Sequence, residues 1–436
     1  MTAQDLSQGQ LIITVIEGMV EAISFIEPHS RINTFTAFPF DQSQLLNLRD
    51  IEQGLEQINR LQSNNASMEL LPGKQPGSSI IQLKSPRSKQ WKTSLSRDNT
   101  GQRSTGELKN TLFFSIDNPL GLNDFSYFNF QQDNEPQSTK KESKSLSWHW
   151  DMPLGYWNMG VDISYFEYLS TVQSVGQQFD SSGTNLSQTV FLSRTLHRSQ
   201  NNKLKLHSRL ERKKSENFIQ DTLLNSSRTL AVANIGIQYE HYLANNDQWD
   251  LSLNYYRGLP LFNAPNDAHR SQGSAKAQFD KVTAHINYKH DISISDAAPT
   301  HFKSKLFLQH SNDILFGSEQ ISVGSLYTVR GYKGSSISAA SGAYWQNTFS
   351  HDFSTAWGGG VIKQISPFIA FDIGSIRDSQ QVYSDKPYAV LKGWATGVQI
   401  QGKTISATLS YARPIDSPRF LVADQEQWYF TLSATL

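Results

Sequence analysis

The sequence contains no cysteine, no net charge and no long apolar run, and each absence excludes a class of protein. Without cysteine there is no disulfide framework, no thiolate metal site and no cysteine nucleophile. Lysine plus arginine and aspartate plus glutamate both number 39, so the composition indicates no polyanionic partner such as nucleic acid. The most apolar stretch, residues 11–16, is far shorter than the roughly 18 to 20 residues of a membrane-spanning helix.

Aromatic residues make up 11% of the chain, although hydrophobic residues reach only 38%. A membrane β-barrel distributes its apolar residues in this way, at every second position of each strand, with aromatic side chains at the rims. The alternative is a soluble β-sandwich, whose strands are usually shorter. From residue 89 onward apolar and polar residues alternate, most clearly at Trp249, Leu251, Leu253 and Tyr255, at Ile405, Ala407, Leu409 and Tyr411, and at Trp428, Phe430, Leu432, Ala434 and Leu436.

Turn signals divide this region into an even number of strands. Short turns on one rim and long loops on the other are typical of outer-membrane barrels. The fold class expected for residues 87–436 is therefore an all-β transmembrane barrel of 16 antiparallel strands, each of roughly 9 to 12 residues. Seven short turns alternate with eight connections that are mostly longer and polar, at 97–106, 132–145, 171–184, 214–226, 258–276, 313–343, 376–388 and 412–426.

Residues 18–86 alternate between strand and helix signals and predict a small α+β domain of order β-α-α-β-β. Residues 50–53 resemble a capping box, followed by an apolar helix face of Ile51, Leu55, Ile58 and Leu61. A strand expected at 11–16 has no partner within this order. The other expected elements are strands at 19–26, 67–71 and 79–84 and a short helix near 41–46.

Motifs for enzymatic chemistry are weak. Residues 397–404 match the phosphate-binding pattern G-x-x-x-x-G-K-[ST], but strand-like alternation on both sides favours a hairpin turn. The 11 histidines do not cluster, and there is no G-x-S-x-G nucleophile elbow. We predict no enzyme active site, no cofactor and no metal, with a hydrolase embedded in the outer wall of the barrel as the alternative.

Arg330 and Asp372 are the best functional candidates. Arg330 lies in the longest and glycine-rich connection, where its planar guanidinium could pair with a carboxylate if the loop folded into the barrel. In segment 368–374, Asp372 shares a strand face with Phe368 and Ala370, while Ile369, Phe371 and Ile373 share the opposite face. The alternative is a surface arginine in a mobile loop and an ordinary acid facing the barrel lumen.

These segments resemble motifs of the TpsB family, the outer-membrane transporters of two-partner secretion that include the hemolysin and hemagglutinin secretion/activation proteins. Val329-Arg330-Gly331-Tyr332 is similar to the VRGY/F tip of the family's sixth extracellular loop. Asp372 and Gly374 are similar to its D-x-G motif on the thirteenth strand, although Ala370 stands where an aromatic residue is often found. Residues 117–124 and 153–156 resemble two family turns, and residues 50–83 resemble its second periplasmic POTRA domain.

The resemblance implies an outer-membrane channel that secretes one large β-helical exoprotein, such as an adhesin, hemolysin or contact-dependent toxin. It implies a POTRA domain at 18–86 in the periplasm that captures the unfolded TpsA-type exoprotein by strand addition, without nucleotide hydrolysis. It also implies a loop latch between Arg330 and Asp372, with Val329, Gly331 and Tyr332 shaping the loop tip and Gly374 allowing close approach. The other implied partners are outer-membrane lipid and the barrel-assembly machinery, with no nucleic acid.

Two departures from the family pattern accompany the resemblance. The sequence lacks a signal peptide, the family's plug helix and most of its first POTRA domain, of which residues 1–17 resemble only the last strand, so an amino-terminally shortened member is expected. Leu436 stands at the end, where such barrels often carry an aromatic residue. The alternative functions are a barrel-assembly insertase of the same superfamily, with a weak seam between its first and last strands, and a passive porin.

Overall fold

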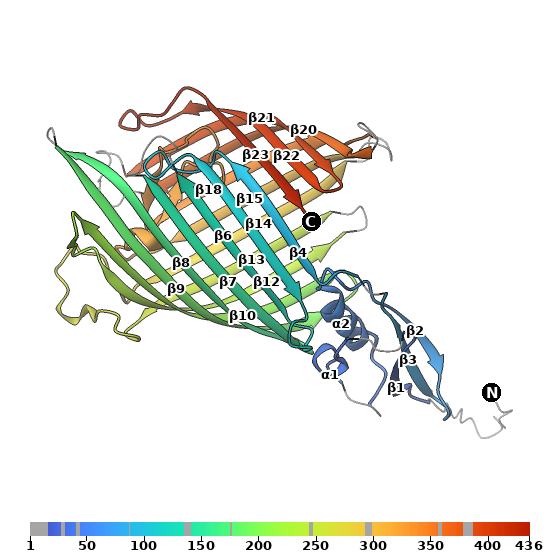
Figure 1. Cartoon of the computed structure of the whole chain (residues 1–436). Helices are drawn as coiled ribbons and strands as arrows, with labels where there is room; N and C mark the ends of the chain where they lie inside the picture. The colour runs from blue at the N-terminus through green and yellow to red at the C-terminus, as the bar shows by residue number, and fades with distance from the viewer. Residues whose placement is uncertain are drawn as a thin grey trace, which may run out of the picture. The chain divides into compact units, whose positions relative to one another are not determined.

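The chain forms two compact units in the computed structural model (Figure 1). The first contains Met1–Gln90 together with two short segments, Asp117–Phe125 and Met152–Tyr156, and the second contains the rest of the chain. No helix among the described residues is long and apolar enough to cross a membrane. The structure describes residues 16–27, 31–40, 44–86, 88–134, 141–174, 177–243, 247–292, 299–355, 360–377 and 387–436.

The first unit has the predicted order of elements around a three-stranded sheet. Strand β3 is central, parallel to β1 and antiparallel to β2. The helix α2 buries Ile51 and Ile58 against Ile81 and Leu83 of the sheet. The elements are β1 (Met19–Phe25), α1 (Thr34–Ala37), α2 (Leu48–Asn59), β2 (Ser67–Pro72) and β3 (Ser78–Lys84).

Two local predictions for this unit are wrong. Helix α2 starts before residues 50–53, because the side chain of Asn47 accepts a hydrogen bond from the Arg49 N–H at 2.9 Å and caps the helix. The helix expected near 41–46 is absent from residues 44–46, where Leu45 forms a β-bridge with Met19. Residues 41–43, and residues 11–15 of the predicted first strand, lie outside the described residues.

The second unit is a closed antiparallel barrel, and the prediction of 16 strands is confirmed. Two strands of two residues, β11 (Thr222–Leu223) and β19 (Phe353–Ser354), extend its ladders. The 16 main strands are β4 (Trp91–Asp98), β5 (Leu108–Asp117), β6 (Phe125–Asn134), β7 (Glu142–Leu154), β8 (Trp157–Ser174), β9 (Gln177–Arg198), β10 (Asn202–Ile219), β12 (Arg228–Tyr242), β13 (Gln248–Leu259), β14 (Asp280–Ile292), β15 (Thr300–His310), β18 (Ser341–His351), β20 (Ile362–Arg377), β21 (Tyr388–Gly402), β22 (Ile405–Asp416) and β23 (Gln427–Thr435).

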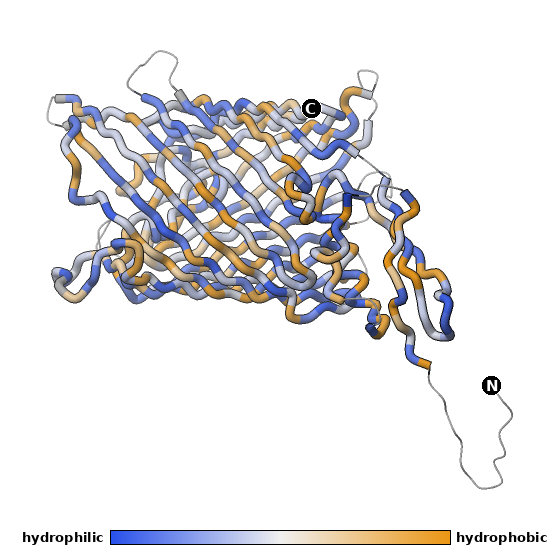
Figure 2. The backbone as a smooth tube through the Cα atoms, turned by 60° about the horizontal axis from the view of Figure 1, so that its bottom comes forward, coloured by the Kyte–Doolittle hydropathy of each residue, from blue (hydrophilic) through white to orange (hydrophobic). Residues whose placement is uncertain are grey.

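Side chains alternate between the two faces of the barrel wall, and Figure 2 shows the resulting alternation of hydrophilic and hydrophobic positions along the strands. On β20, Ile369, Phe371 and Ile373 are 39–50% exposed on the outward face, while Ala370 and Asp372 are buried on the inward face. The inward side is therefore polar at Asp372, as predicted. The P-loop-like segment 397–404 consists of the end of β21 and the tight turn to β22, so the hairpin interpretation is also confirmed.

Strands β8, β9 and β10 are longer than predicted, with 18, 22 and 18 residues. The polar connections expected at 171–184 and 214–226 are therefore wrong for residues 171–174, 177–184 and 214–219, which are strands. These residues pair across the hairpins, for example Thr171 with Asp180. Their polar sequence resembles a loop because strand ends that are solvated on both faces do not need alternating apolar residues.

Gly54 offers a test of packing in the first unit. A Cβ at this position would lie 2.1 Å from Cδ1 of Phe38. We expect Gly54→Ala to lower the free energy of unfolding of this unit by about 1–2 kcal/mol, because overpacking outweighs the usual gain of alanine over glycine in a helix. Pulse proteolysis of the full chain in a urea series would measure the change, with the exposed Leu48→Ala on the same helix as control. An unchanged or higher midpoint for Gly54→Ala would contradict the packing described.

Candidate functional site: the loop inside the barrel

The connection between β15 and β18 forms a small folded hairpin that lies against the inner wall. It contains a helical turn, η2 (Gly317–Glu319), and two short antiparallel strands, β16 (Ile321–Val323) and β17 (Ile337–Ala339). Its apolar residues share one buried cluster with Ile376 of β20 and with Ala389 and Leu391 of β21. The loop therefore folds back into the lumen and buries a core of its own there.

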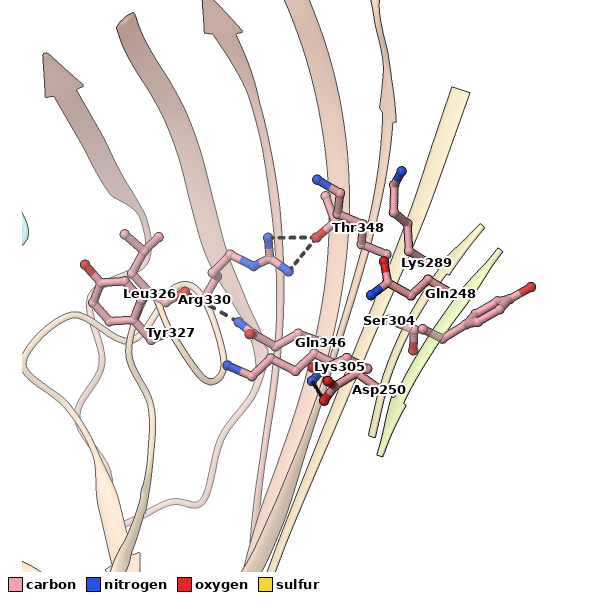
Figure 3. Close-up of a pocket in the computed structure, with 13 residues that line it drawn as sticks. Gln248, Asp250, Lys289, Ser304, Lys305, Leu326, Tyr327, Arg330, Gln346 and Thr348 are labelled. Carbon is pink, nitrogen blue, oxygen red and sulfur yellow. Dashed lines mark hydrogen bonds between the residues drawn. The ribbon is translucent and has the colours of Figure 1, made fainter. Parts of the chain in front are cut away.

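The guanidinium of Arg330 binds the carboxylate of Asp372 in a bidentate arrangement. Nε donates to Oδ2 at 2.6 Å and Nη2 donates to Oδ1 at 2.5 Å, while the backbone N–H of Arg330 also donates to Oδ2 at 3.0 Å. Nη1 and Nη2 each lie 3.2 Å from the hydroxyl of Thr348 on β18, as Figure 3 shows. The side chain of Asp372 is fully buried and that of Arg330 is 11% exposed. Both charges are thus desolvated and almost completely hydrogen-bonded.

Two glycines allow the loop to approach the wall this closely. A Cβ at Gly374 would lie 2.3 Å from Cγ1 of Val323 and 2.9 Å from Cγ2 of Val329. Gly331 has a φ of +101°, and a Cβ there would lie 2.5 Å from the backbone carbon of Arg413. A side chain at either position would push the loop away from the wall and lengthen the Arg330–Asp372 contact.

Val329 and Tyr332 are fully buried on either side of Arg330 and Gly331. Val329 packs in the cluster shared by the loop and the wall. The Tyr332 hydroxyl lies 2.8 Å from the carbonyl oxygen of Lys392 on β21 and 2.6 Å from that of Asp416 on β22. Its single proton can be donated to either carbonyl oxygen. Burial raises the pKa of Tyr332 to about 12, and the hydroxyl stays a neutral donor. All six predicted residues of the loop and strand motifs, Val329, Arg330, Gly331, Tyr332, Asp372 and Gly374, therefore meet in one place.

A second ionic contact holds the base of the loop and was missed in the sequence. Glu319 is 2% exposed, and its carboxylate accepts from Nζ of Lys213 on β10 and of Lys281 on β14, both at 2.8 Å. Burial alone would raise the pKa of Glu319, but the two ammonium groups outweigh burial and hold the pKa below its ordinary value. The only sequence signal is an acidic residue in the longest loop, because its lysines are 106 and 38 residues away.

A cavity of about 480 Å³ lies beside the loop tip (Figure 3). Leu326 and Tyr327 line it from the loop, and Tyr327 is 64% exposed. Lysines 289, 303 and 305 line it from β14 and β15. Among the described residues, no group of three or more His, Cys, Asp or Glu side chains is placed to hold a metal ion.

The haemolysin secretion/activation protein family, ShlB/FhaC/HecB, matches residues 77–400, and the POTRA domain family matches residues 19–72. The chain belongs to the haemolysin secretion/activation family. It is therefore an outer-membrane transporter of two-partner secretion with its POTRA domain in the periplasm. The family is a secretion family and not an enzyme family.

Individual relatives agree with this family assignment. The outer membrane transporter CdiB of Dickeya dadantii (strain 3937) is 32% identical over 429 residues, which cover 97% of this chain and 74% of the relative. The hemolysin transporter protein ShlB of Serratia marcescens is 28% identical and covers 94% of this chain and 69% of its own length. The structure of CdiB from Escherichia coli superposes with a TM-score of 0.91 at 29% identity, covering all of this chain and 80% of that one.

Removal of the Glu319 carboxylate should loosen the loop. Because the chain has no cysteine, Val329→Cys supplies a single buried thiol that reacts with a maleimide only when the loop leaves the wall. We expect a further Glu319→Gln substitution to raise the labelling rate at least about tenfold, because the ammonium group of Lys281 loses its carboxylate partner and that of Lys213 keeps only the 3.3 Å contact with Glu211. Glu216→Gln is the matched control, since it breaks the partly exposed 2.7 Å Lys214–Glu216 pair on β10. Equal labelling with both substitutions would refute this role for Glu319.

Proposed function

We propose that this transporter conducts one large β-helical exoprotein of the TpsA type, such as an adhesin, hemolysin or contact-dependent toxin. The single observation that carries the mechanism is the buried Arg330–Asp372 pair, which holds a folded loop inside the lumen. We assign the pair as the loop latch. Transport of a chain along the lumen requires space that the docked loop occupies, so the latch must open or shift during secretion.

The latch is specific because its two charges have few other partners. Replacement of either residue leaves the other charge desolvated, which costs several kcal/mol at a buried pair. Thr348 hydrogen-bonds the guanidinium but carries no charge, so it does not replace Asp372. Val329 and Tyr332 position the arginine by packing on both sides of it, and Gly331 and Gly374 permit the short contacts.

The first unit offers an edge for capture of an unfolded polypeptide. Within the described residues, β2 pairs only with β3, so its other edge is open to a strand of another chain. Leu70 and Leu71 on β2 are 46% and 36% exposed. On the other side of the sheet, the edge of β1 is partly covered, because Val20 N–H donates to the Gln44 carbonyl at 2.9 Å. We therefore assign capture by strand addition to β2, within a periplasmic domain at 18–86 that precedes the barrel at 87–436.

The barrel seam bears on the insertase alternative. Strands β4 and β23 pair at five positions, from Ser94 to Asp98 on β4. Thr93 and Leu436 exchange two further backbone hydrogen bonds at one end, and the Asn99 side chain bonds Trp428 and Phe430 at the other. A seam that is hydrogen-bonded along this whole length favours a secretion channel over an insertase, which would need a weak seam. The first unit argues against a passive porin, because a porin has no use for a domain that captures polypeptides. Outer-membrane lipid around the outward face and the barrel-assembly machinery during biogenesis are the further partners we assign.

The test is secretion of a candidate TpsA-type exoprotein by cells that express the chain behind a signal peptide. We expect Arg330→Ala and Asp372→Ala each to reduce secretion at least about tenfold, because the loop loses its position while the barrel keeps its hydrogen-bonded wall. Arg97→Ala is the control, since this arginine is exposed on the outward face of β4. Heat-modifiable gel migration verifies that each barrel is folded. Normal secretion by both latch variants would refute the assignment.

A further inference from the structure

A groove lies on the outward wall of the barrel, beside the connection between β13 and β14. Phe262 and Asn263, from the connection between β13 and β14, form one side of it. The other side is barrel wall with both apolar and polar residues, and the groove has a volume of about 570 Å³, within the roughly 300–1,000 Å³ of small-ligand sites. The wall residues are Val161 and Ile163 of β8, Gln188 and Val190 of β9, and Leu210 and Arg212 of β10.

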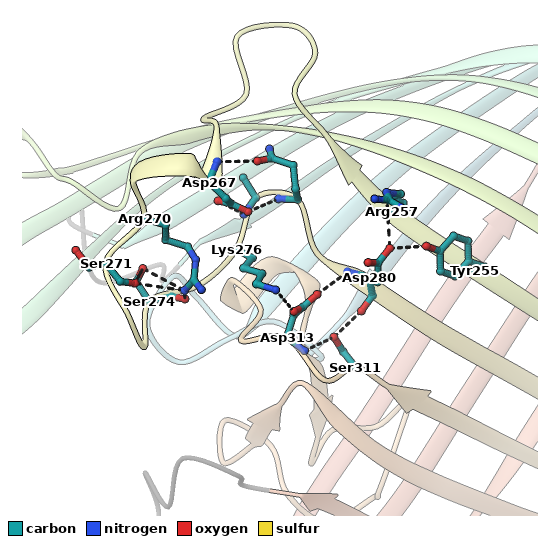
Figure 4. A network of polar contacts seen from close by, with 12 residues as sticks. Tyr255, Arg257, Asp267, Arg270, Ser271, Ser274, Lys276, Asp280, Ser311 and Asp313 are labelled. Carbon is teal, nitrogen blue, oxygen red and sulfur yellow. Dashed lines mark hydrogen bonds and ion pairs between the residues drawn. The ribbon is translucent and has the colours of Figure 1, made fainter.

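The connection that covers the groove is structured. Phe262 and Asn263 both have left-handed backbone conformations, with φ of 56° and 65°, which turn the chain sharply after β13. The Asp267 carboxylate accepts from the backbone N–H groups of Ala277 at 3.1 Å and Gln278 at 2.8 Å. Figure 4 shows this contact together with the ion pair of Lys276 that ties the connection to the next loop. The groove is thus bounded by a fixed loop and a fixed wall.

The groove lies where the outward surface changes from apolar to charged. Ile235 and Ile237 of β12 and Leu253 of β13 are 45–51% exposed on the outward face. Nearer the long loops the outward positions become Arg212, Arg257 and Asp280, as expected where acyl chains give way to headgroups. A ligand in the groove would have its apolar part in the membrane and its polar part at the outer surface.

Arg212 is the cation in this groove without a counter-charge. Among the described residues its guanidinium donates to Oε1 of Gln188 at 2.9 Å and pairs with no carboxylate. Neighbouring outward cations do have partners, since Lys214 pairs with Glu216 at 2.7 Å and Arg257 lies 3.9 Å from Asp280. A guanidinium has five N–H donors arranged in a fork that matches phosphate oxygens.

We propose that this groove binds a phosphorylated lipid of the outer leaflet. One acyl chain lies between Phe262 and the wall formed by Val161, Val190 and Leu210, and the phosphate pairs with Arg212. The groove is continuous with the exposed apolar belt, so a lipid enters it sideways from the membrane. The free arginine at the headgroup level selects an anionic headgroup over a neutral one.

Binding to the full chain in detergent micelles tests the proposal, with native mass spectrometry as readout. The probes are bisphosphorylated lipid A, the same lipid after removal of its phosphates, and inorganic phosphate. We expect one tightly held lipid A per chain, at least about tenfold weaker binding of the dephosphorylated lipid, and no competition by millimolar inorganic phosphate, which has no acyl chain.

Two variants separate the headgroup contact from the groove. Arg212→Gln should weaken lipid A binding at least about tenfold, whereas Arg97→Gln, an outward arginine on β4 away from the groove, should leave it within about twofold. Val190→Trp should block the acyl chain while Arg212 remains, and because Val190 is 61% exposed the barrel should still fold. Equal binding of phosphorylated and dephosphorylated lipid, or unchanged binding by Arg212→Gln or by Val190→Trp, would overturn the proposal and indicate ordinary annular lipid.

Discussion

The desolvated pair of Arg330 and Asp372 is the interaction on which the loop inside the barrel depends. A buried ion pair contributes little net stability, because removing both charges from water costs about as much as their attraction returns. What it does supply is a fixed position. The carboxylate accepts three N–H groups, two from the guanidinium and one from the backbone. Free energy for docking must therefore come from the apolar cluster that the loop shares with β20 and β21.

Two of the ionic contacts of the loop hold it to different parts of the wall. Glu319 ties its base to β10 and β14, while Arg330 ties its tip to β18 and β20. Eleven positions separate the two residues along the chain, so the tip can leave the wall while the base stays in place. A loop anchored at one end returns to its site faster than a free loop would, because its effective concentration near the site stays high.

The features that could be predicted from the sequence are those encoded by residues close together along the chain. Alternation of polar and apolar residues identifies the barrel strands, because each strand has one polar and one apolar face. Arg330 and Asp372 could be identified because a guanidinium in a glycine-rich loop and an inward-facing carboxylate can form an ion pair. The lengths of β8, β9 and β10 could not be predicted, since their outer ends are solvated on both faces and lose the alternation. The role of Glu319 could not be predicted either, because the closure of the barrel is what brings Lys213 and Lys281 to it.

Strand β10 connects the lumen to the lipid face through two adjacent residues. A period of two places Lys213 inward, where it binds Glu319 at the base of the loop, and Arg212 outward, where it lines the groove. The two contacts involve different side chains of the same strand, so a substitution at one residue leaves the contact of the other in place. A shift of β10 in register would exchange the two faces and remove both contacts together. Because β10 forms continuous ladders with β9 and β12, its register is fixed by hydrogen bonds on both sides. The position of Lys213 is therefore fixed, and so is the point at which Glu319 attaches the base of the loop.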